Sequence, residues 1–258
     1  MKIAMIGAGA FGRALGQVLT ENGYGVAYYD KTMKTPLSVV LEGAEMMVLA
    51  VPSNTVSEIL ALLPYSLPLI VTTKGILDAS IFDGFEKISV ISGPGFADDI
   101  ARRKMTYLTT PDKTVAQFFE TEYMQIEYSD DVRGVLMCGA LKNAYAIGAG
   151  MRGLLSGSDE WEIYIKEAAL EMAEILSRNK ARPETVNCYC GIGDLKLTCG
   201  TGSRNYEFGL RVRENPDYHT EKTVEGISTL KHIASGEIIV PEHLKIINEL
   251  AEDSLKWV

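Results

Sequence analysis

The sequence predicts an α/β protein in which a doubly wound parallel sheet is followed by an all-α second domain. Three observations lead to this prediction. Short apolar runs in the first half end in turn residues, helical patterns alternate with these runs, and the apolar residues after about Asp130 follow a helical period. Strands that alternate with helices are joined by right-handed crossovers, which produce a parallel sheet covered on both faces.

Each predicted strand in the first half is a short apolar run bounded by turn residues, as buried strands are. The predicted strands cover residues 2–7, 24–30, 46–53, 67–73 and 87–93. The apolar spacing between them predicts helices over residues 9–22 and 54–63.

The second half predicts helices over residues 130–155, 160–179 and 241–253. The first of these is predicted as one long helix despite its glycines, and the second has a clear period of 3.6 residues. We therefore expect a first domain at residues 1–129 and a second domain at residues 130–258.

The chain has 258 residues and a formal net charge of -9, and it contains no basic tract. This balance argues against nucleic acids and anionic membranes as general partners, although a few placed Lys and Arg side chains can still bind an anionic small molecule. The four cysteines form no paired CxxC motifs, so we expect free thiols and no metal site. With a strand pattern at the N-terminus and no apolar stretch of about 20 residues, we expect no signal peptide, no membrane span and a cytoplasmic protein.

Gly7, Gly9 and Gly12 form a G-x-G-x-x-G motif between the first predicted strand and the first predicted helix. In this context the glycines permit a tight turn, a close approach of the backbone to a pyrophosphate, and close packing of helix against strand. The amide groups at the start of the helix then face the phosphates. The first domain is therefore predicted to be a Rossmann-type domain that binds a dinucleotide.

Asp30 ends the second predicted strand. A carboxylate at this place accepts hydrogen bonds from a ribose 2′-hydroxyl and repels a 2′-phosphate, which favours NAD over NADP. Lys31 and Thr32 follow directly and are able to support a 2′-phosphate, so NADP stays open.

Lys142 lies in an apolar helix of small residues, and Gly139, Ala146 and Ala149 share its side of that helix. Small neighbours leave room for something flat or bulky beside the lysine. An ammonium group near a cofactor can protonate a carbonyl oxygen as hydride arrives. The alternative is a lysine that extends along the helix surface to reach water.

A glycine-rich segment over residues 191–209 offers partners for this lysine. Asp194 is a candidate partner for the ammonium group, and Thr198 follows one helical turn later. The turn before Arg204 and Asn205 is rich in glycine and serine, so its amides and these two side chains make a candidate phosphate cradle. The alternative is a surface turn with a helix cap.

Seven stretches, taken together and in this order, resemble the NAD(P)-dependent glycerol-3-phosphate dehydrogenases. They are GAGAFG, LAVPS, TTKGI, SGPGFADDIA, GALKNAYAIGAG, GIGDLKLTC followed by SRN, and VEG. The resemblance covers most of the chain to about Gly226. It implies an oxidoreductase that interconverts dihydroxyacetone phosphate and sn-glycerol 3-phosphate with NAD(P)H.

The resemblance also implies roles for residues that match the family's motifs. Lys142 matches the lysine that gives or takes a proton at the carbon-2 oxygen, Asp194 matches the carboxylate that orients it, and Lys74 matches a second catalytic lysine that contacts substrate and cofactor. The other implied substrate contacts are Gly93, Thr198, Ser203, Arg204 and Asn205. The other implied cofactor contacts are Ala10, Phe11, Ala97, Arg204 and Glu225.

The chain departs from the family's pattern in four places. The connection over residues 31–44 is shorter, Gly95 stands where serine or threonine is usual, Lys166 stands where arginine is usual, and the helices after Gly226 are abbreviated. These departures keep two alternatives open: a reductase of another small phosphorylated or carboxylated ketone, and a catalytically silent NAD-binding protein. The apolar helices of the second half are also able to form a homodimer interface or simply to close the core.

Overall fold

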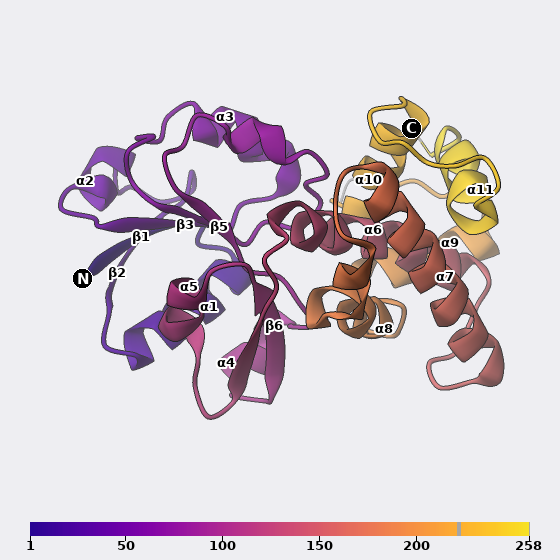
Figure 1. Ribbon diagram of the computed structural model, residues 1–258, viewed down its shortest axis with the longest axis horizontal. Coiled ribbons are helices and arrows are strands. Elements are labelled where there is room, and N and C mark those ends of the chain that lie inside the picture. The colour runs from indigo at the N-terminus through magenta and orange to yellow at the C-terminus, as the bar shows by residue number, and fades with distance from the viewer. Residues whose placement is uncertain (221–222, 258) are drawn as a thin grey trace. The chain divides into compact units, whose positions relative to one another are not determined.

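The computed structural model describes residues 1–220 and 223–257, which form two compact units (Figure 1). Unit 1 comprises Met1–Thr73 and Ala79–Val132, and unit 2 comprises Lys74–Asp78 and Arg133–Val258. The second unit thus includes a short segment that the sequence division placed in the first domain. The predicted domain limits at 129/130 stay a prediction.

Unit 1 is built on a five-stranded sheet in which every neighbouring pair is parallel, with the order β2-β1-β3-β4-β5. The strands are β1 (Lys2–Ile6), β2 (Gly25–Tyr29), β3 (Met46–Leu49), β4 (Leu69–Val71) and β5 (Ile88–Val90). This confirms the predicted fold class, because strands 2 and 3 lie on opposite sides of strand 1, as doubly wound sheets require.

Helices cover both faces of this sheet (Figure 1). The helices are α1 (Ala10–Glu21), α2 (Leu37–Leu41), α3 (Val56–Leu60), α4 (Ala97–Ala101) and α5 (Lys113–Phe119), with 3-10 turns η1 (Ser53–Thr55) and η2 (Ala79–Phe82). Leu15 and Val18 of α1 pack in one apolar core with Ile3 and Met5 of β1 and Ile100 of α4. This core fixes the start of α1 directly after β1.

A second sheet pairs β6 (Thr106–Thr110) with β7 (Met124–Tyr128) in parallel, and α5 forms the crossover between them. The sequence analysis did not predict these strands. Strand β6 lacks the continuous apolar run that marks a buried strand, because three of its buried residues are threonines: Thr106, Thr109 and Thr110. Backbone hydrogen bonds between Ser92 and Thr109 join β6 to the segment that follows β5.

The described part of unit 2 contains helices and turns. The helices are α6 (Val132–Met151), α7 (Asp159–Arg178), α8 (Asp194–Thr198), α9 (Arg204–Glu214), α10 (Glu225–Ala234) and α11 (Lys245–Ser254); a 3-10 turn η3 (Pro183–Asn187) and a π-helical turn η4 (Tyr189–Gly193) precede α8. The all-α second half and the single long helix near residue 140 are confirmed. Among the described residues, no helix has both the length and the apolar character to span a bilayer.

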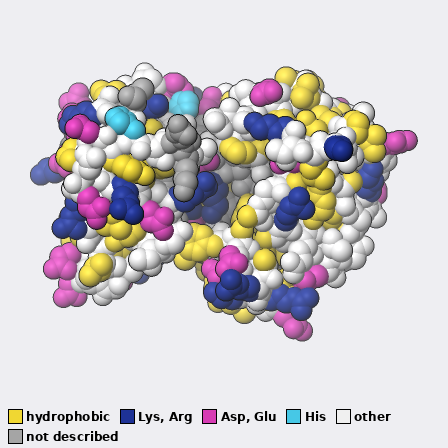
Figure 2. Space-filling model, turned by 180° about the vertical axis from the view of Figure 1, so that it is seen from behind, with side chains coloured by type: hydrophobic (Ala, Val, Ile, Leu, Met, Phe, Trp, Pro, Cys, Tyr) yellow, Lys and Arg dark blue, Asp and Glu magenta, His cyan; other side chains and the backbone are white. Residues whose placement is uncertain are grey.

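Helix α6 is buried along nearly its whole length and forms the centre of unit 2. Its glycines have a packing role: a Cβ on Gly150 would collide with the carbonyl oxygen of Tyr206, and a Cβ on Gly209 would collide with that of Ile147. Helices α6 and α9 therefore approach closely at this crossing. On the face seen in Figure 2, acidic and basic side chains are interspersed.

Candidate functional site

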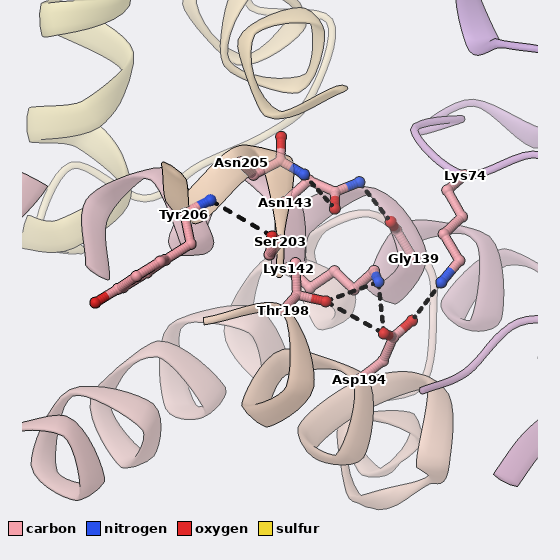
Figure 3. A network of polar contacts seen from close by, with 9 residues as sticks. All are labelled: Lys74, Gly139, Lys142, Asn143, Asp194, Thr198, Ser203, Asn205 and Tyr206. Atoms are coloured by element: carbon pink, nitrogen blue, oxygen red, sulfur yellow. Dashed lines mark hydrogen bonds and ion pairs between the residues drawn. The ribbon is translucent and has the colours of Figure 1, made fainter. Parts of the chain in front are cut away.

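Two lysines flank one buried carboxylate in unit 2 (Figure 3). Lys142 Nζ lies 2.6 Å from Asp194 Oδ1, and Lys74 Nζ lies 3.2 Å from Asp194 Oδ2. Lys142 also donates a hydrogen bond to Thr198 Oγ1 at 3.0 Å, while the Thr198 hydroxyl donates to Asp194 Oδ1 at 3.2 Å. The structure thus brings together four residues that the sequence analysis named from distant segments.

Burial sets the protonation of Lys142, whose side chain is 3% exposed, so it does not reach water as a surface lysine would. Loss of hydration lowers the pKa of Lys142 to about 7; the charge of Asp194 opposes this shift, and the charge of Lys74 adds to it. An amine with a pKa near neutrality is able both to give and to take a proton at physiological pH.

The turn before α8 places Asp194 beside the lysines. Gly191 has a non-helical backbone there (φ -91°, ψ -106°), and a Cβ on it would collide with the carbonyl of Val186 in η3. Asp194 is the first residue of α8, and Thr198 ends the same helix four residues later, so both side chains face α6. Trp161 of α7 fixes the end of this helix by donating to the carbonyl of Cys199 at 2.7 Å.

Lys74 follows directly on two threonines at the carboxyl end of β4. The Thr72 hydroxyl donates to the carbonyl of Leu49 at 2.8 Å, and the Thr73 hydroxyl donates to that of Val51 at 2.9 Å. These bonds fix the backbone from which Lys74 extends. Its side chain is 24% exposed, so its amine is the accessible member of the cluster.

The N-terminus of α9 carries the three residues named as phosphate ligands. The Ser203 Oγ caps the helix by accepting from the amide of Tyr206 at 3.4 Å, which leaves the hydroxyl proton available to donate. Arg204 is exposed, and it makes no ion pair or hydrogen bond within the described residues. A helix N-terminus, a hydroxyl and an unpaired guanidinium together suit a phosphate group.

Asn205 differs from these two neighbours because its amide is already engaged. It donates from Nδ2 to Asn143 Oδ1 at 3.0 Å, and its Oδ1 accepts from the amide of Gly226 at 2.9 Å. It therefore ties α9 to α6 and to the start of α10, where Glu225 lies. Sequence reasoning missed Asn143 as a site residue; the signal available was its place directly after Lys142.

The glycine motif of unit 1 has the geometry that a dinucleotide needs. Gly7 has φ +109°, and a Cβ on Gly12 would collide with the carbonyl of Gly7, so both positions exclude side chains. A Cβ on Gly9 would meet no atom within 4 Å, so this glycine faces open space. Helix α1 begins at Ala10, and its N-cap residue Gly9 has no side chain that could cap it. The residues present thus fit a pyrophosphate at this helix end.

Asp30 lies at the carboxyl end of β2. It accepts hydrogen bonds from the amide of Ala8 at 3.1 Å and from the amide and hydroxyl of Thr32 at 3.0 and 2.7 Å. The Thr32 hydroxyl thus donates to Asp30, and whether it supports a 2′-phosphate stays a prediction. The bonds from Thr32 hold the pKa of Asp30 below its ordinary value.

The other predicted residues fall in both units. Gly93 and Ala97 lie in unit 1, with Ala97 at the start of α4, whereas Lys74, Arg204 and Glu225 belong to unit 2. Gly95 has a packing reason: its Cβ would lie 3.0 Å from the methyl group of Thr106. A serine or threonine at this position would need that side chain to move.

All four cysteines are free, and Cys138, Cys190 and Cys199 are buried while Cys188 is half-buried. Burial raises the pKa of the Cys199 thiol, so this neighbour of Thr198 stays protonated at neutral pH. Within the described residues, no three His, Cys, Asp or Glu side chains gather as metal ligands.

Two family models match the chain. The NAD-dependent glycerol-3-phosphate dehydrogenase N-terminus matches residues 32–116, and the corresponding C-terminus matches residues 131–251. A glycerol-3-phosphate dehydrogenase [NAD(P)+] from Leptospira biflexa is 30% identical over 92% of this chain and 85% of its own length.

Solved structures share the fold. Glycerol-3-phosphate dehydrogenase from Coxiella burnetii has a TM-score of 0.79 at 23% identity, with 98% of each chain covered. The enzyme of that name from Plasmodium falciparum has a TM-score of 0.84 at 18% identity, with 99% of this chain and 92% of that chain covered. At these identities the likeness concerns the fold.

Proposed function

The chain belongs to the NAD-dependent glycerol-3-phosphate dehydrogenase family, and from this premise we propose that it interconverts dihydroxyacetone phosphate and sn-glycerol 3-phosphate. It is an oxidoreductase that uses NAD(P). The observation that supports a role for its own residues is the buried pair of Lys142 and Asp194.

The nicotinamide cofactor, when bound, supplies or accepts the hydride at substrate carbon 2. In the direction of ketone reduction, Lys142 gives its Nζ proton to the carbon-2 oxygen, so that the carbonyl becomes a secondary alcohol. In the direction of oxidation, neutral Lys142 takes that proton back. Asp194 and Thr198 hold Nζ in place through both steps. Nζ lies 2.6 Å from Asp194 Oδ1 and 3.0 Å from Thr198 Oγ1, and these two oxygens lie 3.2 Å from each other.

Lys74 complements this acid–base group. Its half-buried amine donates to Asp194 and is suited to polarise the carbonyl oxygen and to contact the cofactor. Lys142 and Lys74 contact different oxygens of Asp194, so the buried carboxylate has two amines as partners.

The phosphate of the substrate is assigned to the start of α9. Ser203 donates its hydroxyl proton, Arg204 offers its unpaired guanidinium, and the amides of the first turn face the anion. Asn205 contributes mainly by holding this helix against α6. Binding energy far from carbon 2 fixes the reacting carbon, for which a misplacement of about 1 Å costs roughly 100-fold in rate.

The cofactor contacts proposed for unit 1 are Gly7, Gly9, Ala10, Phe11, Gly12, Asp30 and Ala97, with Gly93 as a substrate contact. Those proposed for unit 2 are Lys74, Arg204 and Glu225. The open space at Gly9, the N-cap residue of α1, supports the pyrophosphate position.

NADH oxidation with dihydroxyacetone phosphate tests the activity. We expect turnover with this ketone, and kcat/KM for phosphorylated and carboxylated ketones of similar size at least tenfold lower. A higher kcat/KM for another ketone would favour the alternative reductase, which Gly95 motivates. Tight NADH binding without turnover on any ketone of the panel would favour a silent homologue.

We also propose that the chain forms a homodimer through the outer stripe of α7, made of Ile163, Lys166, Glu167 and Leu170. Ile163 and Leu170 are 56% and 73% exposed, and the two charged residues make no ion pair within the described chain. Because the stripe is symmetric about its centre, an antiparallel second copy would set Lys166 against Glu167 and Ile163 against Leu170. Light scattering after size exclusion should give a dimer for the wild type and a monomer for Leu170→Lys.

A cytoplasmic location is the last part of the proposal. The four free thiols support it, since cysteines stay reduced in the cytosol. Fractionation of cells that express the full chain at native level tests it, with recovery in the cytosolic fraction expected.

A further inference from the structure

The turn after β2 holds the carboxylate of Asp30 at both oxygens. Oδ1 accepts two hydrogen bonds, from the amide and the hydroxyl of Thr32, at 3.0 and 2.7 Å. Oδ2 accepts one, from the amide of Ala8, at 3.1 Å. Two loops thus hold the side chain of Asp30. Thr32 belongs to the loop that follows β2, and Ala8 belongs to the loop that follows β1.

The carboxylate of Asp30 retains one site that can accept a further hydrogen bond. Each carboxylate oxygen accepts about two hydrogen bonds. Within the described chain, Oδ1 of Asp30 is therefore full, whereas Oδ2 retains one acceptor site. A single hydroxyl group fits this vacancy, and a phosphate, which offers only acceptors at neutral pH, does not.

The position of Asp30 at the end of β2 indicates which ligand hydroxyl would bind to Oδ2. Ala8, which binds Oδ2, lies between Gly7 and Gly9 in the loop that precedes α1. A pyrophosphate at the start of this helix directs the adenosine ribose toward the neighbouring strand, which is β2. The oxygen with the open acceptor site, Oδ2, is therefore the one that contacts this loop, through Ala8.

We propose that Thr32 is a positioning residue that locks Asp30 in the orientation that accepts a ribose hydroxyl, and that this lock makes the chain select NAD over NADP. The inference rests on the proposed dinucleotide function and deepens it. An unrestrained aspartate can turn away from a 2′-phosphate, but an aspartate bonded at both oxygens cannot, so its charge and its filled oxygen both oppose that phosphate.

The charged groups around Asp30 sharpen this inference. Lys31 and Lys34 follow in the same exposed turn, and the charge of Lys31 adds to the stabilisation of ionised Asp30. These two lysines are the groups that would attract a 2′-phosphate if the lock did not act. The ratio of NADH to NADPH affinity therefore shows which effect is larger: repulsion of the 2′-phosphate by the fixed carboxylate, or its attraction by the exposed lysines.

The test is a titration of the full chain with NADH and with NADPH, followed by nucleotide fluorescence. We expect the wild type to bind NADH at least tenfold more tightly than NADPH. Thr32→Val keeps the amide but loses the hydroxyl, and should reduce this preference about tenfold, the lower range for a bond to a charged group. Thr32→Ser, which retains the hydroxyl, should restore it. Asp30→Asn should abolish it.

A matched control is Thr20→Val, which removes a hydroxyl that bonds only to the carbonyl of Gly16 within α1. It should leave the NADH to NADPH ratio unchanged. Equal affinities in the wild type, or an unchanged ratio in Thr32→Val with an unchanged melting temperature, would overturn the inference. If NADH binding is selective but dihydroxyacetone phosphate is not reduced, the proposed reaction fails while the selection by Thr32 is supported.

Discussion

The two units hold their candidate sites by different means. In unit 1 the glycine loop depends on backbone shape: Gly7 and Gly12 leave no room for a side chain, and Gly9 faces open space. In unit 2 the cluster depends on buried charge, since Lys142 and Asp194 are almost fully enclosed and satisfy each other. One site is sensitive to a single added methyl group, and the other to a single lost or gained proton.

This difference follows from what each site is proposed to handle. A pyrophosphate carries its own fixed charge, so the protein needs only amides at the correct spacing. Proton transfer requires a group whose charge changes at working pH, and burial is what brings a lysine into that range. The comparison predicts that substitutions in the two units have separable effects on binding, stability and pH dependence.

The largest effect should follow the loss of the Lys142 amine. We expect Lys142→Ala to lower kcat for ketone reduction about 100- to 10,000-fold, the range that general acid catalysis contributes. NADH binding should remain, because the glycine loop lies in unit 1. Steady-state kinetics and an NADH titration measure the two quantities.

A matched control is Lys196→Ala, which removes an exposed lysine of α8 that pairs with Glu162. Its kcat should equal that of the wild type. Full activity in Lys142→Ala would exclude this lysine as the proton donor.

A methyl group added at two glycines should separate shape from binding. In Gly12→Ala the new Cβ collides with the carbonyl of Gly7, so we expect a loss of about 1–3 kcal/mol in the free energy of unfolding and weak NADH binding. In Gly9→Ala the Cβ meets no protein atom, so stability should hold while NADH affinity falls. Thermal unfolding and nucleotide titration distinguish the two variants, and a stability loss in Gly9→Ala would contradict the open geometry.

The pH dependence should follow Lys142 because its pKa is about 7. Ketone reduction needs the protonated amine, so kcat/KM should fall as pH rises through 7, by tenfold per unit well above it. Alcohol oxidation needs the neutral amine and should rise through the same range. Lys74→Met removes a charge that lowers this pKa, so both limbs should move to higher pH. An unchanged pH profile in Lys74→Met would show that the charge of Lys74 does not affect the pKa of Lys142.

The sequence predicted the parallel sheet and the glycine loop well because their signals are local. The pairing of Lys142 with Asp194 spans 52 positions, and no periodicity links α6 to α8; the sequence offered Asp194 only as a candidate partner, which the resemblance then supported. The strand β6 was missed because buried threonines interrupt its apolar pattern, and β7 because Gln125 and Glu127 alternate with its apolar residues. The lock of Thr32 on Asp30 depends on a rotamer, which spacing does not encode. The assigned roles of the site residues stay predictions.

The smallest effect should come from Thr198, which touches both members of the buried pair. Thr198→Val preserves the volume but removes the oxygen that accepts from Lys142 and the hydroxyl that donates to Asp194. Both hydrogen bonds of the hydroxyl are lost, but Asp194 still holds the amine at 2.6 Å, so we expect kcat to fall only about three- to tenfold. Thr198→Ser should recover most of this loss. Because Thr198 orients the pair without carrying a proton itself, the midpoint of the pH profile should move less than in Lys74→Met; a larger shift would show that the hydroxyl, rather than the second lysine, sets the pKa of Lys142.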